Sequence, residues 1–186
     1  MMIVILLGAP GSGKGTQAVP IAEHLGLPII ATGDLFRAAV REGTPVGLEA
    51  RRYMDAGRLV PDEITIRLLR DRLARADAQG GAILDGFPRT RAQAEAITAG
   101  LTQLGRELGA AILIDVPDDV VMQRILNRGQ GRSDDNPETV RERLRVYHGE
   151  IDPLLTYYDE LGLLRRVDGS GDADEVYEQV RRSAEG

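Results

Sequence analysis

Short apolar runs alternate along the chain with longer segments of mixed polarity. Apolar runs of this length, bounded by glycine, proline or aspartate, are typical of buried strands. We predict strands, the second of them weaker than the rest, at Met2–Leu7, Leu27–Ala31, Ala82–Leu84, Ala110–Val116 and Leu163–Val167. Because segments of helical character separate them, the pattern predicts an α/β fold whose five-stranded parallel sheet is flanked by helices.

The segments between the strands carry amphipathic spacing or helix start signals. They predict helices at Lys14–Leu25, Asp62–Ala76, Arg91–Leu104, Asp118–Leu126, Glu138–Leu161 and Asp174–Ser183. Pro20 conflicts with the first of these, because proline removes one backbone hydrogen bond of a helix. Either that helix bends at Pro20 or its predicted boundary is wrong.

Two connections extend beyond the regular alternation of strand and helix. The link from Thr32 to Gln79 is long, helical and polar, and we expect part of it to project as a subdomain. The segment Gly129–Pro137 consists of turn-forming residues and is too short to be a domain. We therefore expect residues 1–186 to form a single domain with two small excursions.

Composition restricts the classes of function. The chain has no cysteine, which excludes disulfides and thiolate zinc sites, so we expect no zinc and only oxygen ligands for any metal. No apolar run approaches the roughly 20 residues of a membrane span, so we expect a cytoplasmic protein that binds no membrane. The net charge of −6 also disfavours nucleic acid as a partner. Lys14 is the only lysine in the chain.

That lysine lies in a glycine-rich segment, Gly8–Thr16, which follows the first predicted strand and opens the first predicted helix. This context is the one that a phosphate-binding loop requires, with backbone N–H groups, a helix N-terminus and a lysine directed at phosphate. Gly15 stands where the general motif has serine or threonine, so we expect Mg²⁺ to be held mainly by phosphates and water. The alternative is a plain turn between strand and helix.

Asp85 ends the third predicted strand. A carboxylate at the carboxyl edge of a parallel sheet lies where such folds bind their ligands, so Asp85 is a candidate for holding Mg²⁺ through water. Taken alone, it would be read as a strand-ending turn residue.

Four motifs occur in the order seen in adenylate kinases: Gly8–Thr16, Ala31–Arg37, Asp85–Arg89 and Arg132–Asp135. The resemblance covers essentially the whole chain. It implies the P-loop nucleoside monophosphate kinase fold and a monomer that converts ATP and AMP into two ADP with Mg²⁺. It also implies an AMP-binding flap at residues 31–60 and a short lid at residues 127–137.

The resemblance implies roles for individual residues. Those implied for catalysis are Lys14, Arg89, Arg124, Arg132 and Arg143. Those implied for ATP are Gly11, Ser12, Gly13, Lys14, Gly15, Thr16, Arg124, Arg128 and Gly171. Those implied for AMP are Thr32, Arg37, Arg58, Leu59, Val60, Gly86, Phe87, Pro88, Arg89, Gln93, Arg132 and Arg143. Arginine suits these roles physically, because its planar donors bind phosphate oxygens in pairs.

Two other functions stay open from the sequence. A CMP or UMP kinase shares the fold, the phosphate loop and the arginines, but Thr32 and the long amide of Gln93 favour AMP. A P-loop module that binds nucleotide without turnover would need the loop but no second, arginine-lined site.

Overall fold

The computed structural model describes residues 2–103, 105–127 and 136–186. Within them, one parallel sheet contains five strands in the order β2-β3-β1-β4-β5. The strands are β1 (Met2–Leu7), β2 (Ile29–Ala31), β3 (Gly81–Asp85), β4 (Glu107–Asp115) and β5 (Leu164–Asp168). The predicted fold class is therefore confirmed, and each predicted strand is present with small shifts at its ends.

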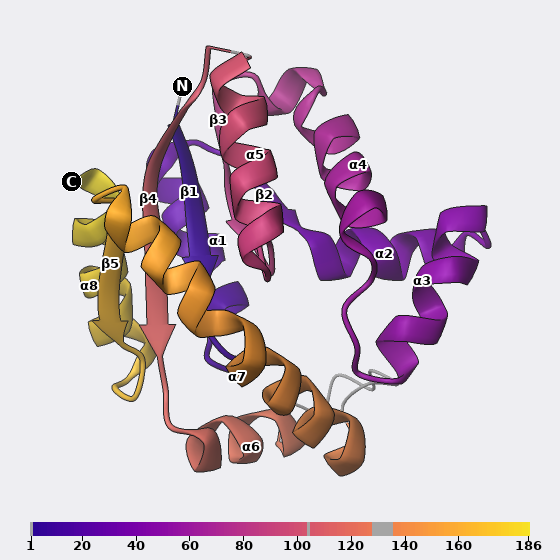
Figure 1. Ribbon diagram of the computed structural model, residues 1–186. Helices are drawn as coiled ribbons and strands as arrows, with labels where there is room; N and C mark the ends of the chain where they lie inside the picture. Colours follow the sequence, from indigo (N-terminus) through magenta and orange to yellow (C-terminus); the bar gives the residue numbers. More distant parts are fainter. Residues whose placement is uncertain (1, 104, 128–135) are drawn as a thin grey trace.

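Helices connect the strands, as Figure 1 shows. They are α1 (Lys14–Leu25), α2 (Thr32–Arg41), α3 (Pro45–Asp55), α4 (Asp62–Leu73), the short 3₁₀ helix η1 (Ala76–Ala78), α5 (Arg91–Gln103), α6 (Asp118–Leu126), α7 (Pro137–Glu160) and α8 (Ala173–Glu185). The predicted bounds of α1 and α6 are confirmed. The helix predicted to continue to Ala76 ends instead at Leu73, and η1 follows it.

Pro20 lies inside α1, so the predicted boundary is right despite the proline. Proline has no N–H to donate to the carbonyl oxygen of Thr16, four residues earlier. Thr16 is exposed, and both residues line a groove between α1 and α8. Water in that groove is therefore able to bond the carbonyl oxygen that Pro20 leaves without an intrahelical donor.

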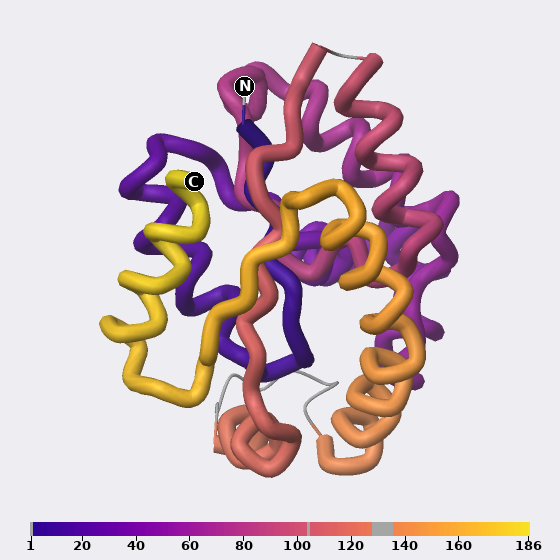
Figure 2. The backbone as a smooth tube through the Cα atoms, turned by 60° about the vertical axis from the view of Figure 1, so that its left-hand side comes forward, coloured from indigo at the N-terminus to yellow at the C-terminus, as the bar shows by residue number. Residues whose placement is uncertain are grey.

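Two layers of helices cover the sheet. One layer consists of α4, α5 and most of α7, whose buried side chains pack with those of Ile3, Ile5 and Leu84. The other consists of α1, α6 and α8, which pack on Val4, Leu6 and Ile112. Figure 2 shows α8 beside α1 on one side of the sheet and α7 on the other. Burial on both faces explains why the inner strands β1 and β3 are almost entirely apolar, whereas the edge strand β5 carries the exposed Arg165 and Arg166.

Helices α2 and α3 project to one side of the sheet (Figure 1). They have a small core of their own around Phe36, Ala50 and Val60. At the end of α3, Gly57 has a φ of +68°, and a Cβ there would lie 2.9 Å from the carbonyl oxygen of Thr139 on α7. Only glycine permits this approach, which brings the projecting helices against the start of α7.

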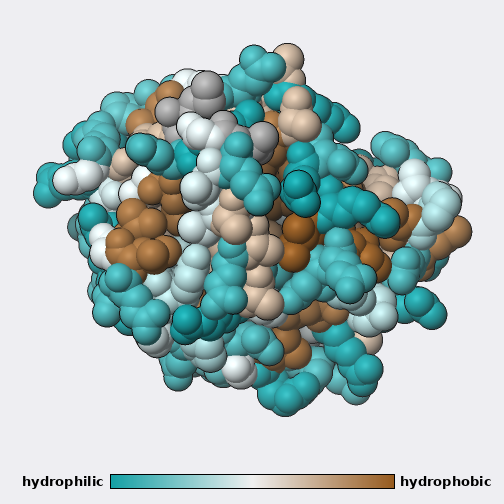
Figure 3. Space-filling model, turned by 45° about the horizontal axis from the view of Figure 1, so that its top comes forward, coloured by the Kyte–Doolittle hydropathy of each residue, from teal (hydrophilic) through white to brown (hydrophobic). Residues whose placement is uncertain are grey.

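The face in Figure 3 is largely hydrophilic, with hydrophobic side chains in separate groups. Among the described residues, the large hydrophobic side chains that are exposed belong to different parts of the chain: Val19, Leu48, Leu126 and Leu161. Within the residues that the structure describes, no helix combines the length and the apolar character needed to cross a membrane.

Candidate active site

The phosphate-loop segment turns tightly between β1 and α1. Gly11 has a φ of +86°, and a Cβ there would lie 2.6 Å from Cγ1 of Ile125 on α6. Glycine at this position therefore permits both the backbone conformation and the close packing on α6. The Lys14 ammonium donates hydrogen bonds of 2.8 Å to the carbonyl oxygens of Gly8 and Ala9, which hold it over the loop.

Asp85 lies beside this loop because β3 pairs with β1. In the register of the two strands, Leu6 is opposite Asp85. A Cβ at position 15 would lie 3.5 Å from Oδ2 of Asp85, so the carboxylate is next to the first turn of α1. The switch in strand order at the centre of the sheet thus brings Lys14 and Asp85 together at its carboxyl edge.

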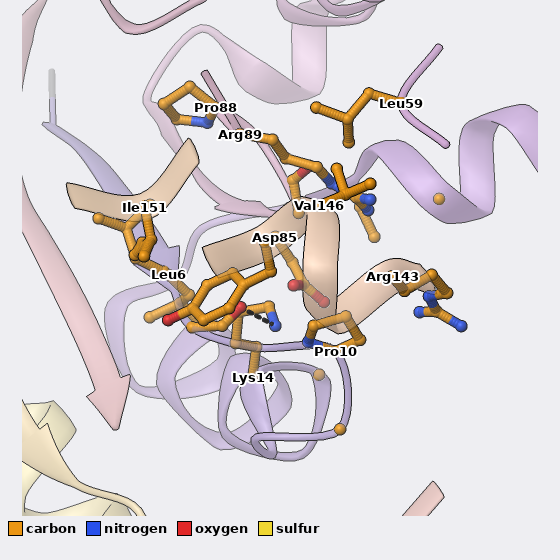
Figure 4. A pocket seen from close by; sticks show the side chains of 18 of the residues that line it. Leu6, Pro10, Lys14, Leu59, Asp85, Pro88, Arg89, Arg143, Val146 and Ile151 are labelled. Carbon is orange, nitrogen blue, oxygen red and sulfur yellow. Dashed lines mark hydrogen bonds between the residues drawn. The ribbon is translucent and has the colours of Figure 1, made fainter. Parts of the chain in front are cut away.

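A cavity of about 400 Å³ opens above these two residues. Figure 4 shows Lys14, Pro10 and Asp85 on one side of it and Leu59 and Arg89 on the other. Helix α7 supplies a wall that consists of Arg143, Val146, Tyr147, Glu150, Ile151 and Leu154. From the predicted ATP site, the loop residues Gly11, Gly13, Lys14, Gly15 and Thr16 line this cavity, while Ser12 is buried in the loop.

A second cavity, of about 70 Å³, lies between the projecting helices and the ends of β2 and β3. Most of the predicted AMP-site residues line it: Thr32, Arg37, Arg58, Leu59, Val60, Gly86, Arg89, Gln93 and Arg143. Pro88 lines only the larger cavity, and Phe87 is fully buried in the core. The structure thus brings together residues from positions 32 to 143 of the sequence.

The two cavities share part of their lining. Arg37, Arg89 and Arg143 contribute to both, as do glycine and leucine residues of the same segments. Three guanidinium groups therefore lie along the boundary between the cavities. This arrangement suits a site in which two phosphate groups meet, because each guanidinium offers paired donors to phosphate oxygens.

Hydrogen bonds orient the side chains around the smaller cavity. The carbonyl oxygen of Gly86 accepts bonds of 2.8 Å from Oγ1 of Thr32 and from Nε of Arg89. Arg37 donates from Nη2 to Oδ1 of Asp34 at 2.6 Å. Arg37 and Arg89 are thus held by local acceptors at the lining of the cavity.

Arg124 lies outside the lining of the two cavities but contacts the phosphate loop. Its guanidinium donates to the carbonyl oxygen of Gly169 at 3.0 Å and to that of Ser12 at 3.5 Å. It thereby joins α6, the loop and the segment after β5, in which Gly171 is exposed. Arg128, Arg132 and most of the predicted lid lie outside the described residues.

Several lining residues were missed by the sequence analysis. Tyr147 and its neighbours on α7 form a cavity wall, which their amphipathic spacing alone could not distinguish from core packing. Thr65 lines the smaller cavity, and Asp62 bonds Gln93 at its edge. No local motif marks these two residues, since they reach the site through the packing of α4 on α5.

Burial changes the acidity of one of these wall residues. Loss of water around the Tyr147 hydroxyl, together with the negative charges of Asp115 and Asp118, raises the pKa of Tyr147 to about 12. The phenol therefore stays neutral at physiological pH.

The donor set suits Mg²⁺ bound together with a phosphorylated ligand. Asp85 provides a carboxylate next to the loop, and Thr16 provides a hydroxyl on the same cavity. In the described part of the chain, no three acidic, histidine or cysteine side chains gather to hold a metal by themselves. Mg²⁺ commonly binds through one or two carboxylates plus phosphate and water, so Asp85 fits such a site.

Comparison with known proteins agrees with this geometry. The family model described as adenylate kinase matches residues 6–163. An adenylate kinase of Nocardia farcinica is 50% identical over 182 residues, covering 98% of both chains. One of Leptospira biflexa serovar Patoc is 47% identical over 98% of this chain and 100% of its own. One of Micrococcus luteus is 47% identical over 97% of this chain and 89% of its own. The chain belongs to the adenylate kinase family of nucleoside monophosphate kinases.

Proposed function

We propose that the larger cavity binds the triphosphate of ATP, that the smaller cavity binds AMP, and that the γ-phosphoryl group passes between them. The observation that carries this proposal is the boundary shared by the two cavities, which Arg37, Arg89 and Arg143 line from both sides. A protein that only bound nucleotide would have no use for this second compartment. The products of the transfer are two molecules of ADP.

Each group has a role that follows from its position. The loop N–H groups, the start of α1 and Lys14 bind the phosphates of the donor. The three arginines at the boundary neutralise the charge of the donor and acceptor phosphates and hold them in line. No general base is required, because the phosphate of AMP is already ionised at neutral pH.

Mg²⁺ completes the donor site in this proposal, with Asp85 as its protein-side partner through water. When bound, the ion would supply positive charge that stabilises the transferring phosphoryl group. Asp85 would orient it, since the carboxylate lies beside the first turn of α1. Arg124 would keep the loop in position through the carbonyl oxygens of Ser12 and Gly169.

Water has to be excluded if the phosphoryl group is to reach AMP and not water. We assign this task to the flap, residues 31–60, and to the short lid, residues 127–137. The contact of Gly57 with Thr139 supports the first assignment, because it joins the flap to α7 beside the cavities. Arg128 and Arg132 of the lid region, and the backbone of Gly171, are further proposed contacts of the nucleotides.

AMP is the proposed acceptor in preference to CMP or UMP, on account of Thr32 and Gln93. A coupled assay that compares AMP, CMP, UMP and GMP tests this, with Thr32→Ala and Gln93→Ala measured alongside. We expect AMP to be the preferred acceptor and both variants to reduce that preference. Equal or better turnover of CMP would assign the chain to pyrimidine substrates instead.

The cellular location, the partners and the oligomeric state of the enzyme are also proposals. A net charge of −6 and the absence of cysteine suit a cytoplasmic protein without nucleic acid partners. We propose that it acts as a monomer, since both cavities are formed by one chain. Size-exclusion chromatography with light scattering at several concentrations tests this directly.

A further inference from the structure

Asp62 forms the centre of a hydrogen-bond network at the edge of the smaller cavity. It lies in the first turn of α4, and its two oxygens accept from two residues at the start of α5. Oδ1 accepts from Nε2 of Gln93 at 2.7 Å, and Oδ2 accepts from Oγ1 of Thr90 at 3.0 Å. Thr90 in turn accepts from the backbone N–H of Gln93 at 3.1 Å. Asp62 therefore holds the side-chain amide of Gln93 directly and its backbone N–H through Thr90.

The amide of Gln93 has only one orientation that satisfies its neighbours. Its Oε1 accepts from the backbone N–H of Arg89 at 2.8 Å, while its Nε2 donates to Asp62. A backbone N–H only donates and a carboxylate only accepts. A reversed amide would therefore place its Nε2 donor against the N–H of Arg89 and its Oε1 acceptor against the carboxylate of Asp62. Gln93 is 2% exposed, so bulk water compensates poorly for such a mismatch.

One N–H and one oxygen lone pair of this amide remain after both bonds are made. Gln93 lines the acceptor cavity together with Thr32, Val60 and Thr65, so a purine in that cavity lies within reach of the amide. The edge of adenine offers an amino donor and a ring-nitrogen acceptor. The edge of hypoxanthine or guanine offers a carbonyl acceptor and a ring N–H donor, in the reverse order.

A glutamine whose side-chain amide could rotate by half a turn would bind either kind of edge equally well. An amide held in one orientation matches only one of them for a purine in a given position. We propose that Asp62 is the positioning residue that makes the acceptor site select a 6-amino purine over a 6-keto purine, by holding the amide of Gln93. This inference rests on the proposed function, in which the smaller cavity binds AMP.

A purely structural role for Asp62 predicts a different outcome. The network joins the first turns of α4 and α5, so loss of Asp62 would also weaken the packing of these helices. A loss of that kind lowers the amount of active protein and affects all acceptors alike. Only positioning of the amide changes the ratio of kcat/KM for AMP to that for IMP, which differs from AMP only at the purine edge.

The test measures this ratio for the wild type, Asp62→Ala and Asp62→Asn, with both acceptors assayed on one preparation of each protein. The ratio does not depend on the folded fraction, so a partly unfolded variant still gives a result. Asp77→Ala is the matched control, because it removes a carboxylate that also accepts two bonds, from Arg72, away from both cavities. Calorimetric titration with AMP and IMP repeats the comparison without turnover.

We expect Asp62→Ala to lower the AMP-to-IMP ratio about tenfold, the equivalent of one hydrogen bond to a charged group. Asp62→Asn retains an oxygen for Gln93 and should stay close to the wild-type ratio, as should Asp77→Ala. An unchanged ratio in Asp62→Ala, whatever its total activity, overturns the inference and leaves the proposed function intact. A wild type that uses no AMP at all overturns the proposed function itself.

Discussion

Thr32 donates a hydrogen bond of 2.8 Å from Oγ1 to the carbonyl oxygen of Gly86, joining the start of α2 to the end of β3. The same carbonyl oxygen accepts from Nε of Arg89, so one backbone group orients two side chains of the acceptor cavity. Thr32 is 2% exposed, so bulk water can do little to replace this partner.

Replacing Thr32 with valine keeps the shape of the side chain but removes the donor. We expect the KM for AMP to rise about fivefold, which corresponds to the loss of roughly one hydrogen bond. The KM for ATP should change little, because Thr32 lines only the smaller cavity. Steady-state kinetics with each substrate varied in turn checks this, and a rise confined to ATP would contradict it.

Arg89 borders both cavities, so its substitution should act on the chemical step. In Arg89→Lys the paired, planar donors are lost although the positive charge remains. We expect kcat to fall by about 10²-fold, as for removal of one preorganised donor to a transition state. Arg91→Lys is the matched control, since Arg91 is exposed and bonds Glu95 on its own helix. Equal kinetics in the two variants would show that Arg89 has no role in the chemical step.

Arg124 should affect the ATP side alone. Loss of its bonds to the carbonyl oxygens of Ser12 and Gly169 frees the phosphate loop from the segment after β5. We expect Arg124→Ala to raise the KM for ATP about tenfold, the value of one charge-assisted bond. Arg106→Ala removes a comparable bond to the carbonyl oxygen of Leu73, away from the cavities, and serves as the control. A similar rise in the control would mean that the effect is not local.

Asp85 is expected to act through Mg²⁺. In Asp85→Asn the charge is lost with little change of shape, and the concentration of free Mg²⁺ for half-maximal activity should rise about tenfold. Asp115 is exposed at the end of β4, which lies on the other side of β1 from β3, so Asp115→Asn is a matched control. Activity measured over a range of Mg²⁺ concentrations decides the matter. Identical Mg²⁺ dependence in wild type and Asp85→Asn would exclude the proposed role.

Tyr147 makes stability sensitive to alkaline pH. Burial and nearby carboxylates raise its pKa in the folded state from 10.0 to about 12, so the folded state binds the phenol proton more tightly than the unfolded state. The resulting stabilisation is complete below pH 10 and is lost as the pH rises from 10 to 12.

Tyr147→Phe should therefore lose less stability than the wild type in that interval. Burial also raises the pKa of Tyr158, and this contribution is common to both proteins and cancels in the comparison. Urea unfolding at a series of pH values provides the measurement. Parallel pH profiles for the wild type and Tyr147→Phe would show that Tyr147 titrates alike in the folded and unfolded states.

Local patterns predicted the parts of the molecule that local physics determines. The phosphate loop lies between a continuous apolar strand and an amphipathic helix, and the predicted bounds of β1 and α1 are those observed. Parallel pairing then follows from the alternation of elements, and it brings Asp85 beside the loop. The strand order, which places β3 directly beside β1, was not predicted from the sequence.

Long-range packing determined what the sequence could not predict. The bounds of α2 and α3 were not predicted, because their small core depends on contacts among short polar helices. Phe87 follows Asp85 and Gly86 in a motif, yet its side chain turns into the core, where an aromatic ring is more stable than at a polar cavity. Asp62 and Gln93 are 31 residues apart, and only the packing of α4 on α5 brings them together.

In the proposed mechanism, a nucleotide in the larger cavity donates a phosphoryl group to a nucleotide in the smaller one, with water excluded. Phosphorus NMR of the protein with equal concentrations of ATP and AMP and excess Mg²⁺ tests it most directly, with Lys14→Met as the inactive comparison. We predict that each ATP and AMP consumed gives two ADP, with no inorganic phosphate and with no reaction in the variant. Loss of ATP with release of phosphate while AMP stays constant would contradict this mechanism.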